Sequence, residues 1–221
     1  MPPTGSSSTD SRSRLQAYLD LVDWRRQVGN LYRLRGPGAL DEFRRGRDRL
    51  FRTHPQSPIP PEERAEFRGL RYFPFDPVFK IRCRMEPGDD SELVIDTGGE
   101  DGQIRYRRAG RLRFELDSRT CELTVFSILG YAGGLFLPFA DFTSGRETYG
   151  AGRYIFDTVK NTDGLALELE PGSAQVTIDF NYAYNPSCAY SPMWACPLAP
   201  AENRLSVAIR AGELTYAAPT R

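Results

Sequence analysis

Two segments of the chain carry the side chains best suited to holding a small polar molecule. The first, residues 141–154, combines Arg146, Tyr149 and Arg153 with three glycines. Glycine lets a backbone approach a ligand closely, and an arginine guanidinium binds carboxylate or phosphate through paired hydrogen bonds. The segment therefore predicts an anion-binding site, with pairing of its arginines to structural carboxylates as the alternative. The stretch GRETYGAG matches neither common glycine-rich phosphate loop, so nucleotide binding of that kind is excluded.

The second segment, residues 179–204, is long, irregular and rich in aromatic, amide and proline residues. Loops of this length in a compact domain are often functional. Seven further candidate ligand contacts lie in it: Asp179, Asn181, Tyr184, Asn185, Tyr190, Asn203 and Arg204. The alternative is an ordered covering loop, in which the amides cap backbone groups and the tyrosines pack over the end of a sheet.

Together the two segments predict a binding module for a small polar or anionic molecule. Arginines would supply charge, tyrosines apolar walls and asparagines orienting hydrogen bonds. One alternative is an enzyme that uses Asp179, a tyrosine or Cys188 at the same site for acid–base or covalent chemistry. Another is a structural or interaction protein that holds no ligand. The pattern assigns no catalytic residue and no cofactor.

The cysteines and the single histidine do not predict a metal site. No two of the four cysteines form a C-x-x-C pair, and His54 is far from all of them in sequence. We expect His54 to be a surface loop residue and the cysteines to be free thiols. Cys188 and Cys196 are separated by seven residues, so the spacing leaves a disulfide between them open.

The composition excludes several classes of partner. The 29 basic and 29 acidic side chains cancel, which argues against binding to nucleic acid or to an anionic membrane. No stretch is apolar enough for a membrane span, and the first residues lack the hydrophobic region of a secretory signal. We therefore expect a cytoplasmic protein. The sequence does not predict its oligomeric state.

The elements that must position these residues change character along the chain. Residues 1–13 are small and polar and are expected to form a disordered tail. One domain then spans residues 14–221, with a helical segment at 14–52, a proline-rich connector at 53–69 and a β region at 70–221. Apolar residues recur at helical spacing in the helical segment, at Leu15, Tyr18, Leu19, Val22 and Leu31 and again at Leu40, Phe43 and Leu50.

From residue 70 the pattern alternates every two residues, most clearly where Phe79, Ile81 and Cys83 alternate with basic residues. Further strands are expected at 92–96, 103–108, 111–116, 121–129, 135–139, 152–157, 165–169, 175–180 and 204–211. Tight turns without helical crossovers join them, which favours an antiparallel sheet. The predicted fold is mainly β (α+β), a barrel-like or sandwich sheet with one or two N-terminal helices packed against it. The candidate site would lie at its open end.

Four motifs also carry a family resemblance. They are FRGLRYFP at 67–74, TSGRETYGAGRY at 143–154, DFNYAYNPSCAY at 179–190 and CPLAPAENRLSVAIRAGE at 196–213. On these motifs the sequence resembles the uncharacterised prokaryotic family called domain of unknown function 1684, and the resemblance covers most of the chain from about residue 15 onward. That family has no established activity. The resemblance therefore implies which residues matter and leaves their role open.

Overall fold

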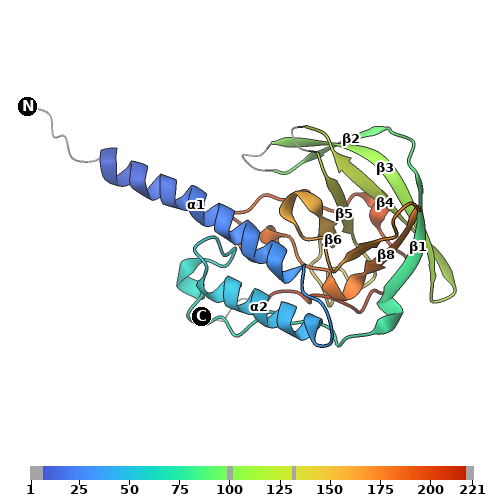
Figure 1. The fold of residues 1–221 in the computed structure, drawn as a ribbon, viewed down its shortest axis with the longest axis horizontal. Helices are drawn as coiled ribbons and strands as arrows, with labels where there is room; N and C mark the ends of the chain where they lie inside the picture. The colour runs from blue at the N-terminus through green and yellow to red at the C-terminus, as the bar shows by residue number, and fades with distance from the viewer. Residues whose placement is uncertain (1–6, 99–101, 131–132, 218–221) are drawn as a thin grey trace, which may run out of the picture.

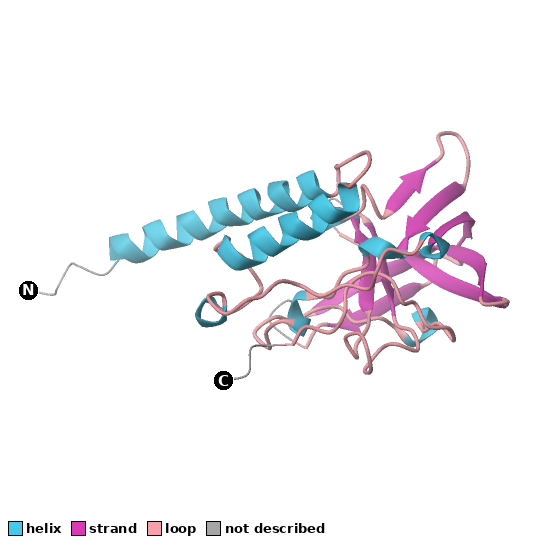
Figure 2. Cartoon of the chain, turned by 90° about the horizontal axis from the view of Figure 1, so that it is seen from below, coloured by secondary structure: helices cyan, strands magenta, loops and turns pink. Residues whose placement is uncertain are grey.

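Two helices and an eight-stranded sheet make up the fold (Figure 1). The computed structural model describes residues 7–98, 102–130 and 133–217. Helix α1 (Ser7–Leu31) and helix α2 (Ala39–Thr53) come first and lie side by side against the sheet (Figure 2). The turn Gly36-Pro37-Gly38 separates them, and Gly38 precedes α2 with a positive φ of 82°.

Helix α2 is amphipathic and packs beside α1, and both helices line the cavity at the end of the barrel. Its buried face carries Phe43, Gly46, Arg47, Leu50 and Phe51, which recur every three or four residues. At Gly46 a Cβ atom would come within 2.2 Å of the Leu31 side chain, so glycine permits the close approach of the two helices. The second predicted helix is therefore confirmed.

Helix α1 differs from its prediction at its N-terminal half. It begins at Ser7, inside the tail that the sequence predicts to be disordered, and residues 1–6 lie outside the described part of the chain. Extending an existing helix fixes one residue for each backbone hydrogen bond gained. The helix can therefore continue N-terminally of Leu15, beyond its apolar residues. Figure 1 shows this half of the helix projecting beyond the barrel. Its apolar residues are exposed: Leu15, Tyr18, Leu19 and Val22.

The strands are short and all pair in antiparallel fashion. They are β1 (Lys80–Pro87), β2 (Glu92–Asp96), β3 (Gln103–Leu116), β4 (Arg119–Ile128), β5 (Leu135–Phe139), β6 (Arg153–Asp157), β7 (Leu167–Leu169) and β8 (Gln175–Asp179). Their order in the sheet is β6-β5-β4-β3-β1-β8-β7, with β2 paired to β3. The strands predicted at 103–108 and 111–116 are one continuous strand, interrupted only by a register shift between Arg108 and Gly110.

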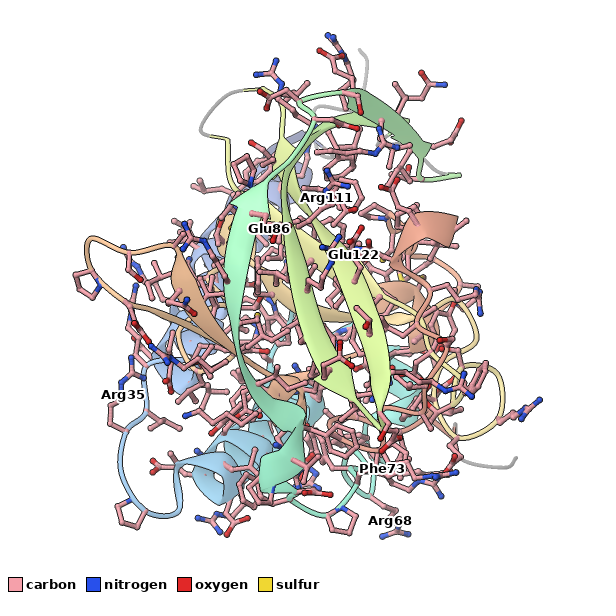
Figure 3. All side chains as sticks on the ribbon, turned by 90° about the vertical axis from the view of Figure 1, so that its right-hand side faces the viewer. Arg35, Arg68, Phe73, Glu86, Arg111 and Glu122 are labelled. Carbon is pink, nitrogen blue, oxygen red and sulfur yellow. The ribbon has the colours of Figure 1, made fainter. Side chains whose placement is uncertain are left out.

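The sheet curls into a nearly closed barrel, as predicted. An isolated antiparallel bridge joins Tyr154 of the terminal strand β6 to Tyr184, just beyond β8. Inward-facing residues of all the central strands form one continuous apolar core. The outward face is charged, and Figure 3 shows Glu86, Arg111 and Glu122 lying together over β1, β3 and β4. Arg113 pairs there with Glu122 at 2.7 Å, so one face of the sheet meets water.

The prediction of a strand at 204–211 is wrong. Apart from a single bridge of Arg204 with Ala140, this segment belongs to no strand. It is nevertheless extended, because Leu205 and Val207 exchange backbone hydrogen bonds with residues 140–142. Beyond that point its carbonyl groups are bound by the guanidinium of Arg153. A side chain thus occupies the place of a neighbouring strand.

Among the described residues, neither helix is both long and apolar enough to cross a lipid bilayer.

Candidate functional site

A cavity of about 440 Å³ lies between the two helices and the end of the barrel. Trp24, Val28 and Leu31 of α1 form one wall, and Leu50 and Phe51 of α2 form another. The barrel side is completed by four residues of the sheet end and the long loop: Tyr154, Tyr184, Tyr190 and Trp194. The walls are thus mostly aromatic and aliphatic, as in most small-molecule sites.

A second hollow, of about 530 Å³, lies between residues 66–71 and 213–217. Its lining includes none of the ten candidate ligand contacts predicted from the sequence. The 440 Å³ cavity is lined by three of them, Tyr184, Asn185 and Tyr190. We therefore take the smaller cavity as the candidate site.

A buried ion pair lies directly behind the cavity wall. Arg47 of α2 contacts the Glu213 carboxylate at 2.8 Å, and both side chains are almost fully shielded from water. Tyr190 donates its hydroxyl hydrogen to Glu213, and the backbone N–H of Asn185 donates to the same carboxylate at 3.2 Å. Arg47 also donates to the hydroxyl of Tyr72 at 3.1 Å. The pair is neutral as a unit and fixes two residues of the cavity wall, Asn185 and Tyr190.

The environment shifts the pKa values of both charged partners upward. Burial lowers the pKa of Arg47, but the Tyr72 hydroxyl and the Glu213 carboxylate more than offset this and hold it well above its ordinary value. Burial raises the pKa of Glu213, and the neighbouring Arg47 charge offsets this only in part. Arg47 therefore stays charged, whereas Glu213 is the member of the pair that can take up a proton.

Two buried polar atoms of the lining residues have no hydrogen-bond partner in the structure. They are the hydroxyl oxygen of Tyr32, which is 1% exposed, and the side-chain carbonyl oxygen of Asn185, which is 2% exposed. The orientation of the Asn185 amide is set by its NH₂ group, which donates to the Leu214 carbonyl at 2.8 Å. Buried polar groups are nearly always paired, so two orphans in one cavity wall call for an explanation.

The charged residues of the cavity lining are all basic. They are Arg25 of α1, Arg47 and Lys160, and the described lining contains no carboxylate. Glu213 neutralises Arg47, so the positive charge of the lining comes from the exposed Arg25 and from Lys160, which is itself paired with a carboxylate. Lys160 lies 3.4 Å from Asp157, with about half of its side chain exposed. The mouth of the cavity is therefore positive and its interior is neutral.

The structure places Arg153, the most prominent candidate of the first segment, in the barrel wall. It contacts Asp141 at 2.8 Å with no solvent exposure of either side chain. Its terminal nitrogens also donate to the carbonyls of Ile209, Ala211 and Glu213. This arrangement is the structural pairing that the sequence analysis gives as the alternative. Arg153 holds the 204–213 segment in place and is not part of the cavity lining.

The remaining candidates lie apart from the cavity. Asn203 makes three hydrogen bonds to backbone atoms of Thr124 and Pro138. The Asn181 side chain donates to the Asp179 carboxylate and to the Asp76 backbone carbonyl. Arg146 and Arg204 are exposed on the surface. Tyr149 donates its hydroxyl hydrogen to the Cys188 thiol at 3.7 Å, beside the loop that closes the cavity. The amides thus behave as the covering-loop alternative predicts.

Sequence reasoning missed the contribution of the helices. Tyr32, Arg47 and Lys160 lie outside both predicted segments, yet all three line the cavity. Arg47 could have been found, because it lies four residues after Phe43 and three before Leu50 on the apolar face of α2. A charged residue in that position needs a buried partner. Nothing in the sequence around Tyr32 or Lys160 distinguishes them.

The expectation for His54 is also corrected. Its side chain is 7% exposed and packs edge-on against Trp24, with the ring centroids 5.2 Å apart. Its Nδ1 accepts the Gln56 backbone N–H, so the proton is on Nε2, which faces the Asp23 carboxylate at 3.2 Å. The proline-rich connector folds back onto α1 and buries the ring. His54 thus ties the connector to the helix.

The cysteines are free thiols, as expected. Cys83 and Cys121 are buried in the barrel, and Cys196 lines the cavity with Cys188 next to it. Within the described residues no group of three or more histidine, cysteine, aspartate or glutamate side chains is placed to hold a metal ion.

The fold and the cavity define a mainly β protein, a nearly closed antiparallel barrel covered by two helices. A family model described as "Protein of unknown function (DUF1684)" matches residues 65–214, and the chain belongs to this family. The predicted family resemblance is thereby confirmed. The matched range contains the loop side of the cavity, whereas α1 and α2 precede it.

A solved structure supports the same relationship. The chain is similar to the solution NMR structure of an uncharacterized protein from Haloarcula marismortui, with 38% sequence identity and a TM-score of 0.56. The match covers 80% of this chain and 92% of the other. A comparison with curated proteins finds no match.

Proposed function

We propose that the protein binds a small amphipathic anion in the 440 Å³ cavity between its helices and its barrel. The observation that carries the proposal is the pair of buried, unpartnered polar atoms, on Tyr32 and Asn185, in one mostly apolar wall. Leaving such a group without a partner costs about 1–3 kcal/mol, and a bound ligand that pairs with it removes that cost.

The lining specifies the chemistry of the ligand. The aromatic walls suit a flat or branched apolar body, and they are held rigid by ring contacts such as that of Phe51 with Tyr190, at 5.0 Å between centroids. The Asn185 oxygen accepts a hydrogen bond, so the ligand must carry an N–H or O–H group. Arg25 and Lys160 favour a carboxylate, sulfonate or phosphate at the mouth.

A probe of this chemistry tests the proposal directly. Anilinonaphthalene sulfonate combines an apolar aromatic body, one N–H donor and one anionic group, and its fluorescence rises on leaving water. We expect it to bind the folded protein in a titration. Val28→Trp, which fills the cavity from α1, is expected to weaken this binding at least tenfold.

Leu169→Trp is the matched control, because it adds the same indole at an exposed position of β7. Equal binding by the parent, Val28→Trp and Leu169→Trp would place the probe elsewhere on the surface and contradict the proposal. Native mass spectrometry of gently purified protein complements the titration. Excess mass that disappears on denaturation would reveal a retained ligand and its molecular class.

A further inference from the structure

Cys188 and Cys196 form a contacting pair of thiols in the loop that closes the cavity. The backbone N–H of Cys188 donates to the Cys196 sulfur at 3.4 Å. Tyr149 in turn donates its hydroxyl hydrogen to the Cys188 sulfur at 3.7 Å. The pair therefore has a direction, with Cys188 as the donor and Cys196 as the acceptor.

This direction makes the two thiols chemically different. The hydrogen bond from Cys188 lowers the pKa of Cys196 most, the backbone N–H groups of Cys188 and Ser187 and the charge of Lys160 add to it, and the result is about 6 despite burial. Donating that bond raises the pKa of Cys188 above its ordinary value. Burial in the barrel raises the pKa of Cys83 to about 11. The pKa of Cys196 is thus lowered whereas those of Cys83 and Cys121 are raised by burial, which sets Cys196 apart as the more acidic thiol.

The position of Cys196 gives small molecules a route to its sulfur. Cys196 is buried from bulk water but belongs to the lining of the cavity, together with Ser187, Trp194 and Ala195 of the same loop. Cys188 lies beside it and is partly exposed. A small oxidant can therefore reach Cys196 through the cavity, with a second thiol beside it.

We propose that Cys196 and Cys188 are a peroxide-reactive dithiol, in which Cys196 is the attacking sulfur and Cys188 the resolving one. The Cys196 thiolate attacks one oxygen of a hydroperoxide, the O–O bond breaks, and the other oxygen leaves as the alcohol, or as water from hydrogen peroxide, after taking a proton. Cys196 becomes a sulfenic acid. The Cys188 sulfur then attacks the Cys196 sulfur and loses its proton, the S–O bond breaks, and water leaves as the disulfide forms.

The step balances as two thiols and one hydroperoxide giving one disulfide, one alcohol and one water. Both sulfurs are oxidised and the peroxide is reduced. The reaction does not require the anion of the proposed function, because it needs only access to Cys196 through the cavity. The proposal makes Cys188 and Cys196 a site of reversible oxidation, where the sequence alone leaves open whether they form a disulfide.

Intact mass and peptide mapping of the full chain test this proposal. Reduced protein is treated with equimolar hydrogen peroxide at neutral pH, with dimedone added to trap sulfenic acids. The parent is expected to lose the mass of two hydrogen atoms, to yield a peptide linking Cys188 to Cys196, and to recover its mass with dithiothreitol. Cys188→Ser is expected to carry dimedone on Cys196, and Cys196→Ser to carry none on Cys188.

Cys83 and Cys121 serve as internal controls in every sample, since both are buried in the barrel. Circular dichroism of each variant checks that it folds, and the parent alone decides the main outcome. Absence of the linked peptide in oxidised parent would overturn the proposal. So would oxidation of Cys83 or Cys121 as fast as Cys196, or dimedone on Cys188 in the Cys196→Ser variant.

Discussion

Two buried arginines, Arg153 in the barrel and Arg47 on helix α2, form similar ion pairs in different surroundings. Arg153 meets Asp141, and Arg47 meets Glu213, each at 2.8 Å and each shielded from water. Around Arg153 three backbone carbonyls use the terminal nitrogens, and the segment is packed closed. Around Arg47 there is a cavity with unpaired polar atoms in its wall.

The comparison teaches that a buried arginine does not by itself indicate a binding site. The surroundings of Arg153 satisfy both of its terminal nitrogens with protein atoms, and only its Nε is left without a partner. The surroundings of Arg47 leave the Tyr32 hydroxyl and the Asn185 side-chain oxygen without partners, and both residues belong to the lining of the cavity. Four substitutions can break or sharpen this contrast.

The largest effect is expected for Arg153→Met. It leaves the Asp141 carboxylate and the carbonyls of Ile209 and Ala211 buried without their partner, so the free energy of unfolding should fall by about 3–5 kcal/mol. Urea denaturation followed by circular dichroism measures it. A loss below about 1 kcal/mol would contradict the structural role of Arg153.

Arg47→Met should cost less, because Glu213 keeps hydrogen bonds from Tyr190 and Asn185 and can take up a proton. Losing Arg47 removes the charge that lowers the Glu213 pKa, so this already raised pKa rises further. Below about pH 4.5, the pKa of Glu213 in the unfolded chain, its carboxyl group is neutral in both the folded and the unfolded variant, so no unpaired charge is buried. As the pH rises above 4.5, Glu213 ionises in the unfolded variant before it does so in the folded variant, so the free energy of unfolding falls.

The measurement for Arg47→Met is therefore a series of urea denaturations between pH 4 and pH 8. The difference in unfolding free energy between parent and variant is expected to grow with pH, up to about 2–4 kcal/mol. Arg47→Met with Glu213→Gln is the control: it lacks the titrating carboxyl group, so its free energy of unfolding should not show the fall with pH that Glu213 causes in the single variant. A pH-independent loss in the single variant would show that Glu213 is not the group left unpaired.

Lys160→Gln tests the positive mouth of the cavity. The chain has only two lysines, which makes Lys80→Gln a matched control on the outer surface, where Lys80 pairs with Glu168 at 2.7 Å. We expect Lys160→Gln to weaken binding of anilinonaphthalene sulfonate several-fold, with stability unchanged within about 0.5 kcal/mol. The effect should shrink at high salt. Equal binding by both lysine variants would remove Lys160 from the site.

Tyr32→Phe should have the smallest effect on stability, and in the unusual direction. It deletes a buried hydroxyl that has no partner in the structure, so the protein should gain up to about 1 kcal/mol while probe binding weakens. Tyr184→Phe is the control, because that hydroxyl bonds Thr162 at 2.8 Å and its loss should cost about 1 kcal/mol. Equal losses in the two variants would mean that Tyr32 is paired in solution.

The sequence predicts the β region well because its strands are half-buried and alternate. The exact bounds of β2 and β5 are recovered, and the split of β3 is an error caused by the bulge at Ala109 and Gly110. Residues 204–211 were mistaken for a strand since they are extended and alternate like one. Their partner is an arginine side chain 56 residues or more away in sequence, which no local pattern reveals.

The site is predicted only on its loop side. Tyr184, Asn185 and Tyr190 stand out because they belong to an unusual aromatic and amide-rich loop. Tyr32 and Lys160 come from ordinary segments and become part of the site only by tertiary packing. Arg146 and Arg153 attracted the prediction through their residue type, while their environments depend on distant residues.

The ion pair behind the cavity has a consequence for the order of folding. Arg47 is separated from Tyr190 by 143 residues and from Glu213 by 166, so these contacts wait for nearly the whole chain. Contacts between residues this distant form slowly, because the intervening chain must first be ordered. During synthesis the apolar face of α2 is made early and its partner last. We therefore expect the cavity to be completed after the barrel, and the helices to spend that interval as the most aggregation-prone part of the nascent chain.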